Sequence, residues 1–225
     1  HEQKQLSEST DHAQLYADAA LAAIRDFDQT SLETTLDNAT RELGYSGLLE
    51  RVIIPVIQRV GEDWHSGHLT AAGEHASTSF IKEYLTNSVR AFAISENAPV
   101  LVVTTPAGQL HELGVFIASC LARKEGWKII YLGPSLPADE IAGAADRVDA
   151  DAILLSITYP IDDPMLGYEL KRLRKLAPEG IPVLVGGMGI TNYAEVLKSI
   201  GAMTIPTLTD VSQSLHDVRA SRVAG

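Results

Sequence analysis

Apolar residues recur with helical spacing from residue 12 to residue 94, a stretch that contains almost no proline. They fall into four successive segments, which predicts four helices. The first segment ends at a break at Asp28. The second begins near Ser31, whose hydroxyl we expect at the helix cap, and it stops at Gly44.

The third and fourth segments carry the same helical pattern. The third runs to Trp64 with an expected kink at Pro55, and the fourth opens near Thr70. Short links between the four segments predict an antiparallel four-helix bundle. The positions expected to face its core are Leu15, Ala19, Ala22 and Ile24, then Leu32, Leu36 and Leu43, then Leu48, Leu49, Val52, Ile53, Val56 and Val60, and finally Ala76, Phe80, Tyr84, Val89 and Phe92.

The pattern changes after a linker at residues 95–97, and short apolar runs then alternate with helical stretches. This alternation predicts an α/β unit with a Rossmann-like, flavodoxin-type sheet of five parallel strands. The strands are expected at 100–104, 128–132, 152–156, 183–186 and 203–205. We therefore predict two domains, a helical bundle over residues 1–95 and a sheet domain over residues 98–225. Ligands of such sheets bind beyond the carboxyl ends of the strands.

Composition narrows the possible classes of protein. Of the 225 residues, 45% are apolar and 21% are charged, and no apolar run is long enough to span a bilayer. The net charge of −11 leaves no basic surface of the kind that nucleic acids require. The single cysteine, Cys120, cannot form an internal disulfide, so we expect a cytoplasmic location. The chain begins at His1 rather than at methionine, and we expect that residues upstream are missing.

The loop after the first strand carries a histidine at the expected ligand edge. It places His111 two residues after Gln109 and three residues before Gly114, and it contains neither a GxGxxG motif nor a Walker A lysine. Imidazole is the commonest nitrogen ligand of transition metals. The alternative is that His111 is an ordinary surface or capping residue.

Hydroxyl and glycine residues follow two other strands at the same edge. Ser156 and Thr158 come at and just after the end of the third strand, and Gly186 and Gly187 close the fourth. Each could be a helix cap or a tight turn. Together they predict a slot beside the sheet, with a hydroxyl at its bottom and glycines that let a bulky group approach the backbone.

These residues resemble the motif of the cobalamin-binding fold, which has an acidic residue, any residue, His, two residues and Gly, then Ser-x-Leu, then Gly-Gly. The resemblance implies that His111 is the lower axial ligand of cobalt and that the displaced cofactor tail lies in the slot. Two residues depart from the motif: Gln109 stands where an acid is usual and Thr158 where leucine is usual. A neutral amide can orient His111 but cannot stabilise positive character on it as a carboxylate would.

The predicted bundle carries a second cluster, in which nine residues separate Trp64 from the pair Glu74 and His75, and His65 follows the tryptophan directly. Trp64 could be a core aromatic, and the histidines could be solvated loop residues. A metal site built from His65, His68, Glu74 and His75 is another alternative, although its spacing matches no common zinc pattern.

Placed before a cobalamin motif, this cluster resembles the light-sensing, cobalamin-dependent repressors of the CarH type in the MerR family. The resemblance covers nearly the whole chain. It implies that Trp64 packs over the adenosyl group of adenosylcobalamin, and that Glu74 and His75 line its pocket. It also implies that His65 binds cobalt once light has expelled that group.

The sequence therefore predicts an adenosylcobalamin-dependent photoreceptor module of a transcriptional regulator, not an enzyme. We expect it to form a homo-oligomer, and to act on DNA only through a missing N-terminal domain or a protein partner. An alternative is the corrinoid protein of a methyltransferase system, which also joins a bundle to this fold and carries methyl groups on cobalt. A third is a sheet domain that has lost its cofactor and serves as an interaction surface.

Overall fold

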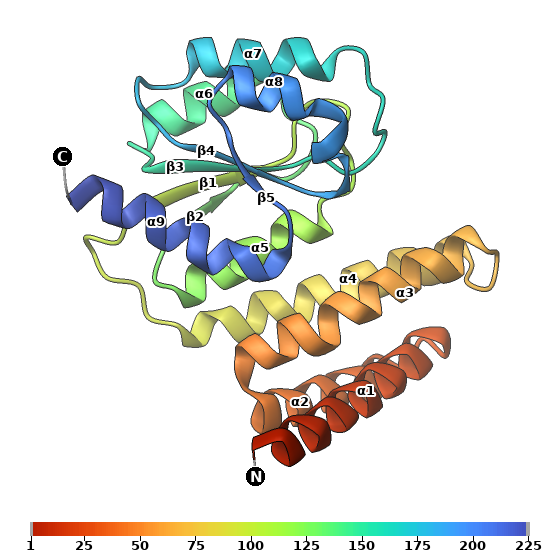
Figure 1. The fold of residues 1–225 in the computed structure, drawn as a ribbon. Coiled ribbons are helices and arrows are strands. Elements are labelled where there is room, and N and C mark those ends of the chain that lie inside the picture. Colours follow the sequence, from red (N-terminus) through yellow and green to blue (C-terminus); the bar gives the residue numbers. More distant parts are fainter. Residues whose placement is uncertain (1, 224–225) are drawn as a thin grey trace. The chain divides into compact units, whose positions relative to one another are not determined.

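The computed structural model describes residues 2–223, with side chains for residues 12–221 (Figure 1). Contacts within the chain divide it into two compact units, one over residues 1–88 and one over residues 89–225. Among the described residues, no helix is both long and apolar enough to cross a membrane.

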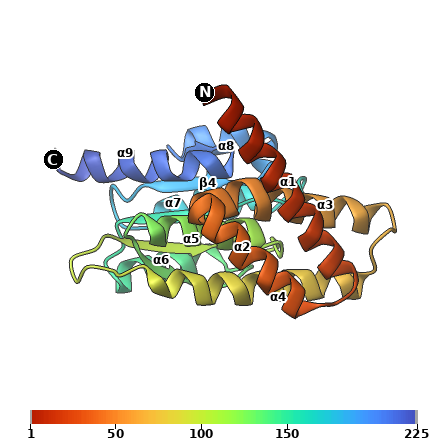
Figure 2. The same cartoon turned by 90° about the horizontal axis from the view of Figure 1, so that it is seen from below.

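The first unit is the expected bundle of four helices. Its helices form two consecutive pairs, each pair joined by a short turn, and the second pair enters through a π-helical turn (Figures 1 and 2). The helices are α1 (Glu2–Arg25), α2 (Gln29–Leu48), α3 (Ile54–His65) and α4 (Ala71–Ser88), and the π-helical turn spans Leu49–Ile53.

The helix ends differ in detail from the sequence prediction. The carboxylate of Asp28, not the Ser31 hydroxyl, caps α2, because it accepts hydrogen bonds from the Ser31 backbone N–H at 3.0 Å and from the Ser31 hydroxyl at 2.6 Å. Gly44 interrupts the helix as expected, with φ of 70°. Pro55 lies in the first turn of α3, directly after the π-helical turn. The interruption expected at Pro55 is therefore this π-helical turn rather than a kink within a continuous helix.

Two helices bury a different face from the one predicted. In α1, Ile24 is buried as predicted, but the other buried positions are Ala13, Ala17, Ala20 and Ala23, whereas Leu15 is 64% exposed. Small alanine side chains let α1 pack closely against a neighbouring helix, and this outweighs the hydrophobicity of Leu15. In α4 the buried residues are Gly73, Ser77, Ile81 and Leu85, and the predicted Ala76, Phe80 and Tyr84 are only half-buried. Helix α4 ends at Ser88, so Val89 and Phe92 lie outside it.

The second unit is a sheet of five parallel strands in the order β2-β1-β3-β4-β5, which confirms the flavodoxin-type prediction. Helices α6, α7 and α8 cover one face, and α5 and α9 cover the other (Figure 1). The strands are β1 (Val100–Thr104), β2 (Lys128–Tyr131), β3 (Ala152–Ser156), β4 (Val183–Gly186) and β5 (Met203–Ile205). The helices are α5 (Leu113–Lys124), α6 (Ala138–Arg147), α7 (Leu166–Leu176), α8 (Ala194–Ser199) and α9 (Val211–Val223).

Side-chain alternation along the strands decides what each face carries. Ile153, Leu155 and Val185 belong to the core that includes residues of α6, α7 and α8. Ser156 and Gly186 are the next positions along β3 and β4, and they pair in register. Because successive side chains point to opposite faces, Ser156 and Gly186 belong to the face covered by α5 and α9.

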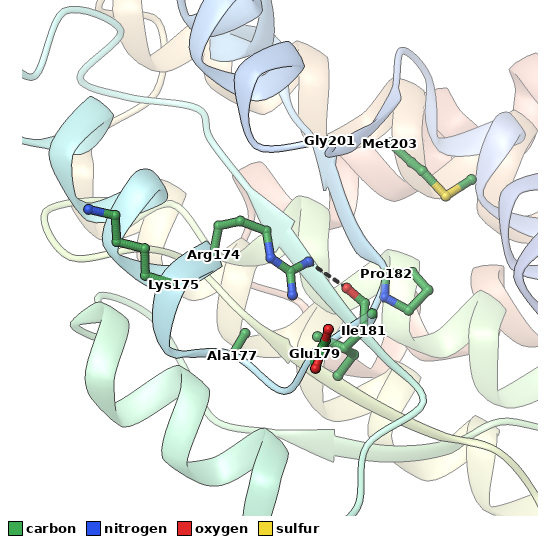
Figure 3. A pocket seen from close by; sticks show the side chains of 9 residues that line it. Arg174, Lys175, Ala177, Glu179, Ile181, Pro182, Gly201 and Met203 are labelled. Atoms are coloured by element: carbon green, nitrogen blue, oxygen red, sulfur yellow. Dashed lines mark hydrogen bonds between the residues drawn. The ribbon is translucent and has the colours of Figure 1, made fainter.

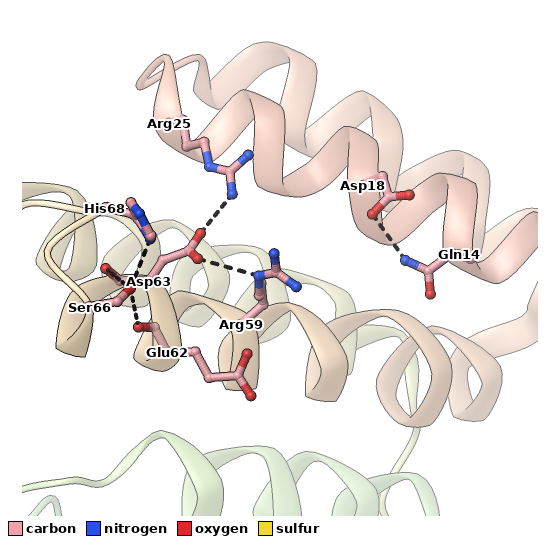
Figure 4. A network of polar contacts seen from close by, with 8 residues as sticks. All are labelled: Gln14, Asp18, Arg25, Arg59, Glu62, Asp63, Ser66 and His68. Carbon is pink, nitrogen blue, oxygen red and sulfur yellow. Dashed lines mark hydrogen bonds and ion pairs between the residues drawn. The ribbon is translucent and has the colours of Figure 1, made fainter.

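A buried carboxylate fastens the end of α1 to α3 (Figure 4). Asp63 is 7% exposed, and it accepts hydrogen bonds from Arg25 of α1 at 2.6 Å and from Arg59 of α3 at 3.3 Å. The hydrogen bond from Arg25 holds the pKa of Asp63 below its usual value. Asp63 therefore contributes to stability in its ionised form.

Replacing this carboxylate should loosen the bundle. We expect Asp63→Asn to lower the melting temperature at pH 7, measured by circular dichroism, because the neutral amide loses both charged interactions. The contribution of Asp63 is fully present above its unfolded pKa of about 3.9 and is lost as the pH falls through its lower folded pKa. The difference between variant and wild type should therefore shrink below about pH 4.

Asp18→Asn is the matched control, because Asp18 is exposed and only accepts a hydrogen bond from Gln14 one turn away. It should leave the melting temperature almost unchanged. Equal effects of the two substitutions would contradict the role given to Asp63.

Candidate functional site

Parallel strand register brings three loops to one edge of the sheet. Thr104 pairs with Leu155 across β1 and β3, and Ser156 pairs with Gly186 across β3 and β4. The loops that follow these strands, residues 105–112, 157–165 and 187–193, therefore start side by side. They contain the sequence-predicted residues Gln109, His111, Thr158 and Gly187.

Gly187 is the point where the fourth strand's loop passes closest to the third. Its φ is 101°, and a Cβ there would lie 2.2 Å from the carbonyl oxygen of Ile157 and 2.9 Å from Oγ of Ser156. Only glycine fits both the conformation and the space. A Cβ at Gly186 would be 3.4 Å from its nearest neighbour, so Gly186 is much less constrained.

The hydroxyls of the third strand lie next to this close approach. Oγ of Ser156 is 3.3 Å from Oγ1 of Thr158. Ser156 is buried and Thr158 is half-buried. The two hydroxyls can therefore act together as a small hydrogen-bonding group beside Gly187.

Gln109 is buried and uses both ends of its side-chain amide. Its Oε1 accepts a hydrogen bond from the backbone N–H of Thr158 at 2.8 Å, and its Nε2 donates to the carbonyl oxygen of Pro160 at 3.0 Å. The sequence led us to expect that Gln109 orients His111 directly. In the structure these two hydrogen bonds go instead to the backbone of the loop after β3.

His111 is exposed at the same edge. Its ring meets the ring of Tyr159 edge-on, with the centroids 5.9 Å apart and an interplanar angle of 85°. The neighbouring Glu112 accepts a hydrogen bond from the hydroxyl of Tyr131. Burial, reinforced by that carboxylate, raises the pKa of Tyr131. A Cβ at Gly114 would meet open space, so there is room beside the first turn of α5.

Large apolar side chains are exposed on the three loops of this edge, and the sequence analysis missed them. We call the group formed by Leu110, Tyr159, Ile161, Met165 and Met188 the apolar rim; its members are between 44% and 80% exposed. They come from all three loops at the carboxyl edge. Exposed apolar side chains gathered on neighbouring loops are typical of surfaces that a ligand or a partner covers. The visible signal was an unusual content of large apolar residues in loops that are otherwise polar.

The bundle residues singled out from the sequence gather at one end of their own unit. Trp64 and His65 end α3, with ring centroids 4.8 Å apart, and Glu74 and His75 lie in the first turns of α4. Oε2 of Glu74 is 3.1 Å from Nδ1 of His75. Trp64 is 40% exposed rather than a buried core aromatic. These four residues therefore offer aromatic, carboxylate and imidazole groups on the two helix ends that flank one turn.

The alternative metal site in this cluster is wrong. Within the part of the chain that the structure describes, no group of three or more His, Cys, Asp or Glu side chains is placed to hold a metal ion. Nδ1 of His68 instead lies 2.9 Å from the hydroxyl of Ser66 (Figure 4).

A hollow of about 460 Å³ lies away from the histidine edge (Figure 3). It opens beside the residues that precede β4 and β5, which is the amino edge of the sheet. Arg174 donates hydrogen bonds across it to the carbonyl oxygens of Ile181 at 2.7 Å and Pro178 at 3.0 Å. Arg174 therefore stabilises the loop after α7.

Family comparisons agree with this geometry. Residues 99–206 match the family model described as B12 binding domain, and residues 16–87 match a second model with the same description. Each of the two units thus matches a B12 binding domain model. The helical one comes first and the Rossmann-like one follows, which confirms the predicted fold class.

Two related proteins support the resemblance to CarH-type repressors. The HTH-type transcriptional repressor CarH of Myxococcus xanthus is 28% identical over 189 residues, which cover 84% of this chain and 63% of CarH. The repressor CarA of the same organism is 26% identical over 185 residues, which cover 82% of this chain and 62% of CarA. The chain thus spans less than two thirds of the length of either repressor.

A solved structure confirms the fold independently. The monomethylamine corrinoid protein of Methanosarcina barkeri has a TM-score of 0.70 with this chain at 15% identity, covering 91% of this chain and 99% of its own. This chain therefore shares its fold with the monomethylamine corrinoid protein.

The close approach at Gly187 gives a direct test of the site's architecture. We expect Gly187→Ala to destabilise the sheet unit by about 2 kcal/mol or more, because the new Cβ would overlap the Ile157 carbonyl in a backbone conformation that alanine avoids. Chemical unfolding measures the change. Gly180→Ala separates the two causes, since Gly180 also has a positive φ, of 76°, but open space around its Cβ position. A loss no greater than that of Gly180→Ala would contradict the close approach.

Proposed function

We propose that this chain is the adenosylcobalamin-binding light-sensor module of a transcriptional regulator, with His111 as the lower axial ligand of cobalt. The observation that carries the proposal is the exposed imidazole of His111, which meets the ring of Tyr159 at the carboxyl edge of the sheet. The residues present fit the cofactor, because an imidazole nitrogen suits cobalt and an apolar rim suits the faces of a large macrocycle.

Each sheet-unit residue has a role in this proposal. His111 would offer a ring nitrogen to cobalt, and the apolar rim would limit the access of water to the bound cofactor. Ser156 and Thr158 offer hydroxyls to the polar tail of the cofactor. Gly114 leaves open space that a bulky group can approach, whereas Gly186 and Gly187 let the ends of β3 and β4 pack closely and offer backbone to the cofactor.

The bundle residues are proposed to cover the upper face of the cofactor. Trp64 would stack on the adenine, while Glu74 and His75 would bind the adenosyl group by hydrogen bonds. Bound adenosylcobalamin supplies a cobalt–carbon bond that visible light breaks, which opens a coordination position. His65, exposed next to Trp64, is the imidazole proposed to take that position. This exchange is the two-state event that a switch requires.

We further propose that the switch changes self-association or partner binding, in the cytoplasm, and that the chain is not itself an enzyme. DNA would be bound through a domain outside this chain or through a protein partner. The Rossmann-like unit and the bundle are shared with CarH, an HTH-type repressor, and this supports the regulatory proposal.

A second candidate function is that of a corrinoid protein in a methyltransferase system, which carries methyl groups on cobalt. The fold shared with the monomethylamine corrinoid protein favours it. A methyl carrier has no need of groups that cover an adenosyl moiety. The presence of Trp64, Glu74 and His75 near the turn between α3 and α4 therefore supports the first candidate.

Cobalamin binding through His111 can be tested by substitution. We expect His111→Ala to weaken binding of adenosylcobalamin at least about tenfold and to abolish the visible spectrum of histidine-ligated cobalt. His216→Ala, an exposed histidine on α9, is the matched control and should change neither. Unchanged affinity and spectrum in His111→Ala would overturn the assignment of this histidine.

Light sensing is tested by size-exclusion chromatography of the adenosylcobalamin-loaded protein in the dark and after illumination. We expect a light-dependent shift in elution.

Trp64→Ala should lose the preference for adenosylcobalamin over methylcobalamin, since the stacking partner of the adenine is gone. His65→Ala should still lose the adenosyl group in light but release the cofactor on dialysis. Equal affinity of wild type and Trp64→Ala for both cofactors would favour the methyl carrier.

A further inference from the structure

Three contacts join the loop after β1 to the loop after β3. The amide of Gln109 bonds to Thr158 and Pro160, and the ring of His111 meets the ring of Tyr159. The loops also touch further along, since a Cβ at Gly108 would lie 2.8 Å from Oδ2 of Asp163. The two loops are therefore packed together, although about fifty residues separate them in the chain.

The contact made by Gln109 requires an amide rather than a carboxylate. Gln109 is 1% exposed, and its side chain must both accept from the N–H of Thr158 and donate to the carbonyl oxygen of Pro160. An ionised carboxylate could accept the first bond but would place a negative oxygen against the second carbonyl. An unpaired buried acceptor is costly, so glutamine fits this position better than the acid usual in the motif.

Tyr159 lies between the two residues that Gln109 holds. Its neighbours on either side, Thr158 and Pro160, are fixed by the amide, so the backbone of Tyr159 is fixed as well. Tyr159 is itself exposed, and its ring contact with His111 is the one ring interaction of that imidazole in the described structure. The place of the tyrosine ring against His111 thus depends on Gln109.

We propose that Gln109 is a positioning residue that acts on His111 through Tyr159. Its amide holds residues 158–160, and the ring of Tyr159 then restricts the orientation of the imidazole. The importance of this orientation for cobalt binding rests on the proposed function. The coupling of Gln109, Tyr159 and His111 is a property of the cofactor-free protein, so it does not depend on the proposed function.

The coupling is tested by NMR of the cofactor-free full chain, using the imidazole C–H signals of His111, assigned with His111→Ala. Tyr159→Leu removes the neighbouring ring and should shift these signals. Gln109→Met keeps the length of the side chain but loses both hydrogen bonds, and it should shift them in a similar way. The double variant should show no further shift, because both changes break one pathway. Gln58→Met and Tyr168→Leu, at exposed positions, are the matched controls.

Aquocobalamin binding supplies the second measurement. We expect Gln109→Met and Tyr159→Leu each to raise the dissociation constant about tenfold, as loss of a partner of a metal-binding histidine does, and the double variant to raise it no further.

Unshifted His111 signals in folded Gln109→Met, or additive effects in the double variant, would overturn the proposal. If Gln109→Met does not fold, two other variants test the proposal. They are Gln109→Glu, which keeps the hydrogen bond to Thr158, and Tyr159→Leu, at an exposed position. Unshifted His111 signals in both variants would overturn the proposal. Failure of the wild-type chain to bind cobalamin would overturn the proposed function alone, since the NMR result would stand.

Discussion

The parallel pairing of β1, β3 and β4 is the constraint on which the candidate site depends. Because the three strands run in one direction and end in register, their loops emerge at one edge, and His111, Ser156 and Gly187 meet there. The closest point is the contact between Gly187 and the carbonyl of Ile157, where no side chain fits. Backbone packing therefore sets how closely the loops after β3 and β4 approach each other at this edge.

The amide at position 109 changes the chemistry expected at His111. In the usual motif an acid can stabilise positive character on the histidine. Here both polar atoms of the Gln109 amide form hydrogen bonds with the backbone of the loop after β3. The imidazole then contacts an aromatic edge, which restricts its orientation without adding negative charge. A metal bound by His111 would meet a more neutral ligand, and this bears on how readily that ligand is exchanged.

In the bundle unit, the candidate binding residues Trp64 and His65 lie where α3 ends, before the turn that leads to α4. Asp63 is tied to Arg25 and Arg59, so the end of α3 is held by charged hydrogen bonds rather than by apolar packing alone. The next two residues, Trp64 and His65, remain exposed. The charged contacts of Asp63 thus hold the helix end on which these exposed aromatic and imidazole groups lie.

The sequence by itself determined the two-unit architecture, the positions of all five strands and the place of His111 at the ligand edge. Buried parallel strands are continuous apolar runs, and their order follows from a small set of allowed connections, so local pattern was sufficient. Tertiary structure alone decided that α1 buries alanines rather than Leu15, that Asp28 caps α2, and that Gln109 binds Thr158 and Pro160. These features depend on how closely helices approach and on contacts between loops far apart in the chain, and neither leaves a periodic signal in the sequence.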